Sequence, residues 1–311
     1  MADSTGADET PAPTRHMPGL LLTLAIGVAF AVIWSSAFSV ARILVLETPP
    51  FALSVVRFAV AGAIAGGIAL ALGQPLPRGR AAWRTIALLG LCQNTIYLGL
   101  YFTAMTTIPA ALAAIMASAM PLVVAALAPA LLGERVRAAK ALGLAVGFAG
   151  VVWIMGSRLA GGVDPFGVAL AICGTVALGI ATLTVKRGDF GTGLLMVVAC
   201  QMGVGALGCL PLTLLFEDPL AWNLTEETLP RLVPAFAYQV LMPGIVATLL
   251  WFLLVKRVSA AGASSFHFLN PGFGVAFAWV LLGEPVSWVD AAGVALTAAG
   301  ILLVNRTQGA G

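Results

Sequence analysis

The chain has 311 residues, and it is far too apolar for a soluble protein. Hydrophobic residues make up 60% of it, charged residues only 9%, and its mean hydropathy is +1.02, whereas soluble domains are about half apolar and a quarter charged. So few charged residues cannot solvate the surface of a soluble protein. The formal net charge of +3 is therefore informative only through the positions of the charges along the chain. Long runs rich in Leu, Ala and Gly favour helices in lipid over the alternating pattern of a β-barrel.

The N-terminal stretch, residues 1–18, is polar and contains several prolines. It has no apolar core ahead of a cleavage site, so it predicts a disordered cytoplasmic tail and not a signal peptide. The first apolar run after it is expected to direct the chain to the membrane.

Ten apolar runs follow, separated by Gly, Pro and charged residues, and each predicts a transmembrane helix. The expected spans are 20–44, 51–72, 83–105, 110–132, 138–156, 166–185, 194–216, 232–255, 261–282 and 288–304. Most connections between them are too short to fold alone. We therefore expect an all-α integral membrane protein without an extramembrane domain.

The basic residues orient this predicted bundle. One side collects Arg15, Arg78, Arg80, Arg84, Arg135, Arg137, Lys140, Lys186, Arg187, Lys256, Arg257 and Arg306, and the other only Arg158 and Arg231. Positive residues concentrate on the cytoplasmic side of membrane proteins. The pattern predicts an inner-membrane protein with both termini in the cytoplasm and the acidic loop 217–231 outside.

The two halves of the sequence repeat. At an offset of 150 residues Pro121 aligns with Pro271, and "LLGERV" at 131 aligns with "LLGEPV" at 281. Five spans per repeat is an odd number, so the second copy is expected to enter the membrane inverted. The predicted architecture is two inverted five-helix repeats, residues 19–157 and 165–305, with a substrate site between them near the midplane.

The two "LLGE" signatures, with "IWSSAFSVAR" in the first span and "FALSVVRF" in the second, resemble the EamA family of the drug/metabolite transporter superfamily. The resemblance covers nearly the whole chain. Within that family the sequence is similar to the YddG-type aromatic amino-acid exporters. This resemblance implies a ten-helix carrier, many of whose relatives export amino acids or related metabolites.

Polar residues on the first span form a stripe, because Ser35, Ser39 and Arg42 share one helix face beside Trp34. They are candidates to line the substrate path, with Arg42 attracting a carboxylate near the outer mouth. Alternatively, the serines bond their own backbone and Arg42 extends to the interface. Arg57 on the second span is expected to bond carbonyl groups at a helix end.

The third span places Asn94, Tyr97 and Tyr101 on one face. An amide and two phenols suit the polar end and the ring of an aromatic ligand, although hydrogen bonds between helices are the alternative. The 150-residue offset pairs Tyr101 with Trp251, which becomes a candidate substrate contact as well. The alternative for Trp251 is a place in an interface belt.

The ninth span holds His267 and Asn270 just before Pro271. Proline donates no N–H, so the carbonyl of His267 is expected to be free. An intramembrane histidine is a functional candidate, and a neutral histidine bonded to a neighbouring helix is the alternative. Pro121, Pro243 and Pro271 are the expected hinges.

The motifs exclude several mechanisms. The sequence has no G-x-x-x-x-G-K-[ST] run, so we expect that this chain does not itself hydrolyse ATP. The four cysteines lack the C-x-x-C spacing of metal or redox sites; they are Cys92, Cys173, Cys200 and Cys209. No nucleophile–base pair indicates an enzyme, and we expect no metal and no cofactor. Every Asp and Glu falls in a loop or at a helix end, which favours facilitated export over proton coupling.

We therefore predict a secondary transporter that exports small metabolites, including aromatic amino acids, by alternating access. Its expected partners are the small-molecule substrate and the bilayer, without nucleic acid. A drug or lipophilic-cation exporter is the alternative, and an intramembrane enzyme or scaffold is less favoured. The sequence leaves the oligomeric state and the substrate open.

Overall fold

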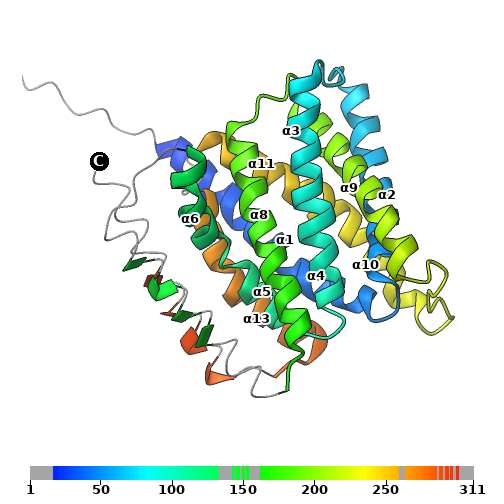
Figure 1. Ribbon diagram of the computed structural model, residues 1–311, viewed down its shortest axis with the longest axis vertical. Helices are drawn as coiled ribbons and strands as arrows, with labels where there is room; N and C mark the ends of the chain where they lie inside the picture. Colours follow the sequence, from blue (N-terminus) through cyan, green and yellow to red (C-terminus); the bar gives the residue numbers. More distant parts are fainter. Residues whose placement is uncertain are drawn as a thin grey trace, which may run out of the picture.

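The computed structural model is an all-helical bundle (Figure 1). It describes residues 17–132, 162–258 and 263–285, with isolated residues between 142 and 153 and between 287 and 300. Within these residues, seven helices are long and apolar enough to cross a membrane. The chain is therefore a multi-pass membrane protein.

The elements of the first half are α1 (Met17–Val45), α2 (Pro50–Ala71), α3 (Arg80–Gly90), the π-helix η1 (Leu91–Leu98), α4 (Gly99–Ala104), α5 (Ala110–Ala117) and α6 (Met120–Leu132). Those of the second half are α8 (Pro165–Arg187), α9 (Leu194–Phe216), α10 (Leu229–Gln239), the π-helix η2 (Val240–Ala247), α11 (Thr248–Arg257), the 3₁₀ helix η3 (Ser265–Leu269) and α13 (Asn270–Leu282).

The expected spans that fall on described residues agree with these helices to within about three residues at each end. The expected spans 138–156 and 288–304 and nearly all of the tail 1–18 lie outside the described residues. The span expected at 110–132 is divided by a turn at Ser118 and Ala119 into α5 and α6. Pro121 explains this break, because proline has no N–H to donate and disrupts the interior of a helix. In the first turn of α6 its missing N–H costs nothing, since the amides of a first turn have no acceptor within the helix.

Two long helices contain a π-helical segment in the middle. η1 lies between α3 and α4, and η2 lies between α10 and α11; η2 begins 149 residues after η1. The repeat therefore has an offset of 149 residues at this depth, whereas α6 and α13 begin 150 residues apart. The alignment by elements pairs Phe102 with Trp251, one position away from the Tyr101 pairing expected from the sequence. π-Helical turns often occur at functional sites.

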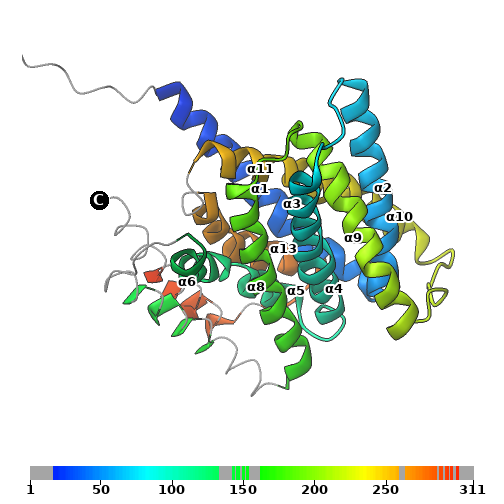
Figure 2. The ribbon, with the colours of Figure 1, turned by 45° about the horizontal axis from the view of Figure 1, so that its top comes forward.

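Helices α2 and α9 run side by side through one flank of the bundle (Figures 1 and 2). Small residues make this approach possible. A methyl group added at Gly62 would lie 3.2 Å from the carbonyl oxygen of Ala199, and one at Gly66 would lie 3.5 Å from its Cβ. Gly62 and Gly66 thus form the packing face that a small-xxx-small pattern predicts.

Carboxylates bind several helix N-termini at one end of the bundle. Glu217 accepts hydrogen bonds from the amides of Phe51 and Ala52 at the start of α2, at 2.8 and 2.9 Å. Glu284 accepts from Ala110 and Ala111 at the start of α5, at the same distances. A negative charge is stabilised there by the unpaired amides and by the helix dipole.

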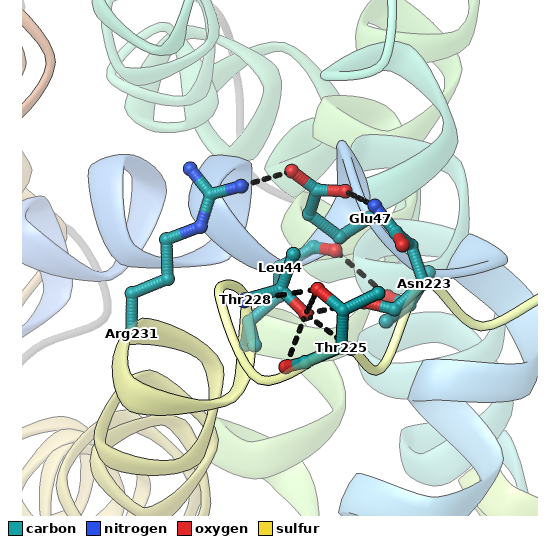
Figure 3. Close-up of polar contacts among 7 residues, drawn as sticks. Leu44, Glu47, Asn223, Thr225, Thr228 and Arg231 are labelled. Carbon is teal, nitrogen blue, oxygen red and sulfur yellow. Dashed lines mark hydrogen bonds and ion pairs between the residues drawn. The ribbon is translucent and has the colours of Figure 1, made fainter.

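The acidic loop before α10 is fixed against the end of α1 (Figure 3). Glu47 forms an ion pair with Arg231 and accepts a hydrogen bond from the side chain of Asn223, while its carbonyl accepts from the Asn223 amide at 2.9 Å. Thr225 and Thr228 bond each other within the loop. This end of the bundle therefore has an ordered loop.

Candidate functional site

A buried cavity lies between α1, α2, the α3–η1–α4 helix and the α10–η2–α11 helix. Its lining consists of Trp34, Ala37, Phe38, Ala41, Arg57, Tyr97, Leu98, Tyr101, Phe102, Met105, Gln239, Pro243 and Thr248. The open volume is about 20 Å³, which is room for about one water molecule. A substrate of amino-acid size therefore requires the walls to move apart.

Aromatic rings form one wall of this cavity. Trp34 and Tyr97 lie parallel, with 6.2 Å between ring centroids, and the Tyr97 ring lies 4.9 Å from that of Tyr101. Phe38 continues the row at 5.8 Å from Tyr101. Rings arranged in this way favour an apolar or aromatic body of a ligand.

The hydroxyl group of Tyr101 is already engaged. It lies 2.7 Å from the Oγ1 atom of Thr175 on α8, and Thr175 in turn donates to the carbonyl of Ala171 at 2.8 Å. Since the threonine proton is used there, Tyr101 is the donor to Thr175. Gly174 makes room for this ring, because a Cβ there would lie 2.7 Å from it.

Arg57 is the cationic group of the cavity, and only 2% of its surface is exposed. Its Nε donates to the carbonyl of Gln239 at 3.0 Å, at the junction of α10 with η2 and not at the helix end that the sequence suggested. This is the one hydrogen bond that the guanidinium makes to the described residues, and Nη1 is buried without a partner. The rings of Phe58 and Phe102 lie 5.3 and 5.4 Å from the guanidinium carbon.

Sequence reasoning missed several wall residues. Gln239 donates from its side chain to the carbonyl of Ala37 on α1 while its own carbonyl receives Arg57, so it connects three helices. Phe102 had no polar neighbour pattern to distinguish it from an ordinary core residue, whereas Phe38 lies beside the polar stripe of the first span in the sequence. Thr248, at the start of α11, bonds the carbonyl of Pro243 at 3.0 Å. The π-helix η2 creates that five-residue reach, and no sequence pattern indicated it.

Three candidate residues form a second polar cluster beside the cavity. Ser35 donates to Oδ1 of Asn270 at 3.2 Å, and Nδ2 of Asn270 lies 2.8 Å from Nδ1 of His267. With the amide in this orientation Nδ1 is an acceptor, so the proton is on Nε2. Nε2 has no partner among the described residues.

Aromatic rings separate His267 from the cavity. Phe30, Trp34 and Trp251 all meet the imidazole edge-on, with centroids 5.1, 6.1 and 4.9 Å away. Trp34 belongs to both groups, whereas Trp251 is buried and stacked on Phe30 at 5.0 Å. His267 and Trp251 thus lie behind the wall of the cavity and not on its surface.

The remaining candidates lie apart from one another in the bundle. Asn94 points to α9, where its Nδ2 donates to the carbonyl of Gln201 at 2.8 Å. Ser39 is fully buried, and its hydroxyl has no partner in the described part of the chain. Pro243 lines the cavity, while Pro121 and Pro271 begin α6 and α13.

Arg42 is held at the C-terminal end of α1. It donates to the carbonyls of Met105, at 2.8 Å, and Ile108, and its Nε lies 3.6 Å from Glu284. Arg42 does not line the cavity. No three His, Cys, Asp or Glu side chains in the described ranges gather closely enough to hold a metal ion.

The EamA-like transporter family matches the chain twice, over residues 20–156 and 165–306. An uncharacterized inner membrane transporter of Escherichia coli (strain K12), YedA, is 27% identical over 90% of both chains. A chloroplastic WAT1-related protein of Arabidopsis thaliana is 27% identical over 89% of this chain and 67% of its own.

A third relative, from Streptantibioticus cattleyicolor, is described as a probable terminal-alkyne amino-acid exporter. It is 28% identical over 90% of this chain and 92% of its own. A solved crystal structure without a functional name has 25% identity and a TM-score of 0.63, covering 93% of this chain and 99% of its own. The chain thus has sequence relatives, and a solved structure of similar fold, along nearly its full length.

Proposed function

This chain belongs to the EamA-like transporter family of the drug/metabolite transporter superfamily, and we propose that it exports amino acids, including aromatic ones, across the bacterial inner membrane by alternating access. As a member of that family it is a membrane transporter and not an enzyme. The observation that carries the proposal is the buried aromatic cavity between the two π-helical segments.

The proposed architecture is ten transmembrane helices in two inverted five-helix repeats, approximately 19–157 and 165–305, with both termini in the cytoplasm. Two family matches in one chain support a duplication. The recurrence of an α–π–α helix in each half supports it further. Inversion follows if each repeat crosses the membrane an odd number of times.

The proposed substrate site is the aromatic cavity with the polar cluster behind it. Trp34, Tyr97 and Tyr101 are proposed to contact the substrate directly. Ser35, Ser39, Asn94, Trp251, His267 and Asn270 are proposed to join the site when the walls separate, with Pro121, Pro243 and Pro271 as hinges. One relative is named as an exporter of an amino acid, which agrees with the proposed substrate class.

A counterflow assay tests the function. The purified protein is reconstituted in liposomes loaded with unlabelled substrate, and uptake of labelled tryptophan, threonine or a lipophilic cation is followed. We expect saturable exchange of tryptophan exceeding that of the cation. Exchange of the cation alone would instead support a drug exporter, the alternative function.

A further inference from the structure

The cavity holds a cation without a counter-ion. Arg57 is the one charged residue in its lining, and the lining as described contains no Asp or Glu. No ion pair between Arg57 and a carboxylate is present in the described part of the chain. Burying a charge without a counter-ion inside a membrane protein costs free energy, so such a charge indicates a functional site. The missing counter-ion can then be supplied by a bound ligand.

The protein holds the guanidinium through its Nε edge. Nε is bound to the carbonyl of Gln239, and the rings of Phe58 and Phe102 hold the planar group by cation–π contacts. Both Nη atoms have no hydrogen-bond partner among the described residues. Two adjacent N–H donors on one plane match the two oxygens of a carboxylate.

Gly244 keeps this geometry possible. A Cβ atom at this position would lie 2.9 Å from the carbonyl oxygen of Gln239 and 3.9 Å from Nη2 of Arg57. Because a side chain there would displace the carbonyl that receives Nε, Gly244 is a positioning residue for the arginine.

Arg42, the cation that the sequence suggested for carboxylate attraction, donates from Nη1 to two carbonyls, and its Nε lies 3.6 Å from Glu284. Arg57 instead lies within reach of the aromatic wall, since Tyr97, Phe102 and the guanidinium line the same space. We propose that Arg57 binds the carboxylate of the transported substrate, and that the site selects carboxylate-bearing molecules with an aromatic body over cations. This inference rests on the proposed transport function.

Three probes with the same phenyl group separate charge from shape. N-Acetylphenylalanine is an anion, phenylalanine a zwitterion, and phenethyltrimethylammonium a permanent cation. In proteoliposomes we expect the wild-type protein to take up both carboxylates at least about tenfold faster than the cation, as one charge-assisted hydrogen-bond pair predicts. Faster uptake of the cation, with saturable uptake of phenylalanine retained, would overturn the inference about Arg57 and leave the transport of aromatic amino acids standing.

The variants locate the selectivity. Arg57→Gln should slow uptake of both carboxylates about tenfold or more and leave the cation unaffected, whereas a merely structural role would slow all three probes equally. Arg57→Lys keeps the charge and should retain the preference for carboxylates, with a higher KM. This variant also tests the proposal if Arg57→Gln does not fold. Arg231→Gln, at the surface, is the matched control and should match the wild-type protein.

Two results contradict the proposal in different ways. Equal losses for all three probes in folded Arg57→Gln, or loss of the carboxylate preference in Arg57→Lys, would assign Arg57 a structural role only. If the wild-type protein shows no saturable uptake of any probe, the proposed transport of aromatic metabolites fails, and the inference fails with it.

Discussion

Tyr101 contributes its ring to the cavity but not its hydroxyl proton. The ring faces Phe38 and Tyr97, and the hydroxyl donates to Thr175 on α8. The two parts of the side chain are therefore expected to have separate roles. The ring is expected to select the substrate, whereas the hydroxyl group holds α4 against α8.

Tyr101→Ala is expected to lower uptake of tryptophan more than uptake of threonine, because stacking area is lost only for the aromatic substrate. Tyr101→Phe removes only the hydrogen bond to Thr175. It should lower the free energy of unfolding by about 0.5–1 kcal/mol without changing the ratio of the two uptake rates. Tyr238→Ala truncates an aromatic residue outside the cavity lining and serves as the control. An unchanged tryptophan-to-threonine ratio in Tyr101→Ala would remove Tyr101 from the substrate path.

At the scale of helices, the glutamate of the second "LLGE" signature connects three elements. Glu284, after α13, binds the first amides of α5 and lies 3.6 Å from Arg42 at the end of α1. Its side chain is 13% exposed, so solvent screens these interactions only in part. The motif that identified the family therefore has a structural task at one end of the bundle.

Glu284→Gln should destabilise the protein by about 1–3 kcal/mol, because the amide keeps one acceptor oxygen and loses the charge. A thermal shift in detergent measures the loss. Glu227→Gln, in the exposed part of the loop before α10, should leave the melting temperature unchanged. Equal melting temperatures for the two variants would show that the cap contributes little.

Asp164 gives a pH-dependent contribution at the start of α8. The hydroxyl of Thr107, at 2.8 Å, and the amides of Phe166 and Gly167 hold the pKa of its carboxyl below the ordinary value of 3.8. Since the folded pKa is lowered, the stabilisation is complete above that ordinary value and disappears as the pH falls through the folded pKa.

Asp164→Asn should therefore melt earlier than the wild-type protein at pH 7, and the difference should shrink as the pH falls below about 4. Thermal unfolding of both proteins over this pH range provides the comparison. A difference that stays constant with pH would mean that the charge of Asp164 does not contribute.

The sequence predicted the helices because apolar length and proline position determine them in lipid, and α9 matches its expected span at both ends. The π-helical segments were not predictable, since the spans were identified by the length of each apolar run, which an extra residue in one turn does not alter. Trp34, Tyr97, Tyr101 and Pro243 were selected by residue type, and they do line the cavity. The role of Arg57 depends on which of its nitrogens remain unpaired, which only the packing of α2 against η2 determines.

Across the whole molecule, charge is divided between the two ends. At one end Lys186 donates to the carbonyls of Val255 and Val258, and Lys256 donates to that of Gly188, so each lysine binds the end of the other's helix. The opposite end contains the carboxylates that bind helix N-termini and the loop before α10. Under the positive-inside rule this asymmetry predicts that the lysine end faces the cytoplasm.

Single cysteines in a Cys-free background test this orientation and the ten-helix proposal together. Leu76 is exposed in the α2–α3 loop, and Thr225 is exposed in the loop before α10. These two loops lie at opposite ends of the bundle in Figure 1. In intact cells an impermeant thiol reagent should label Thr225→Cys and not Leu76→Cys. Gly309→Cys, beyond the described residues, should also stay unlabelled, because an even number of spans returns the chain to the cytoplasm. Labelling of Gly309→Cys and Thr225→Cys from the same side would require an odd number of spans, and the inverted pair of five-helix repeats would then be wrong.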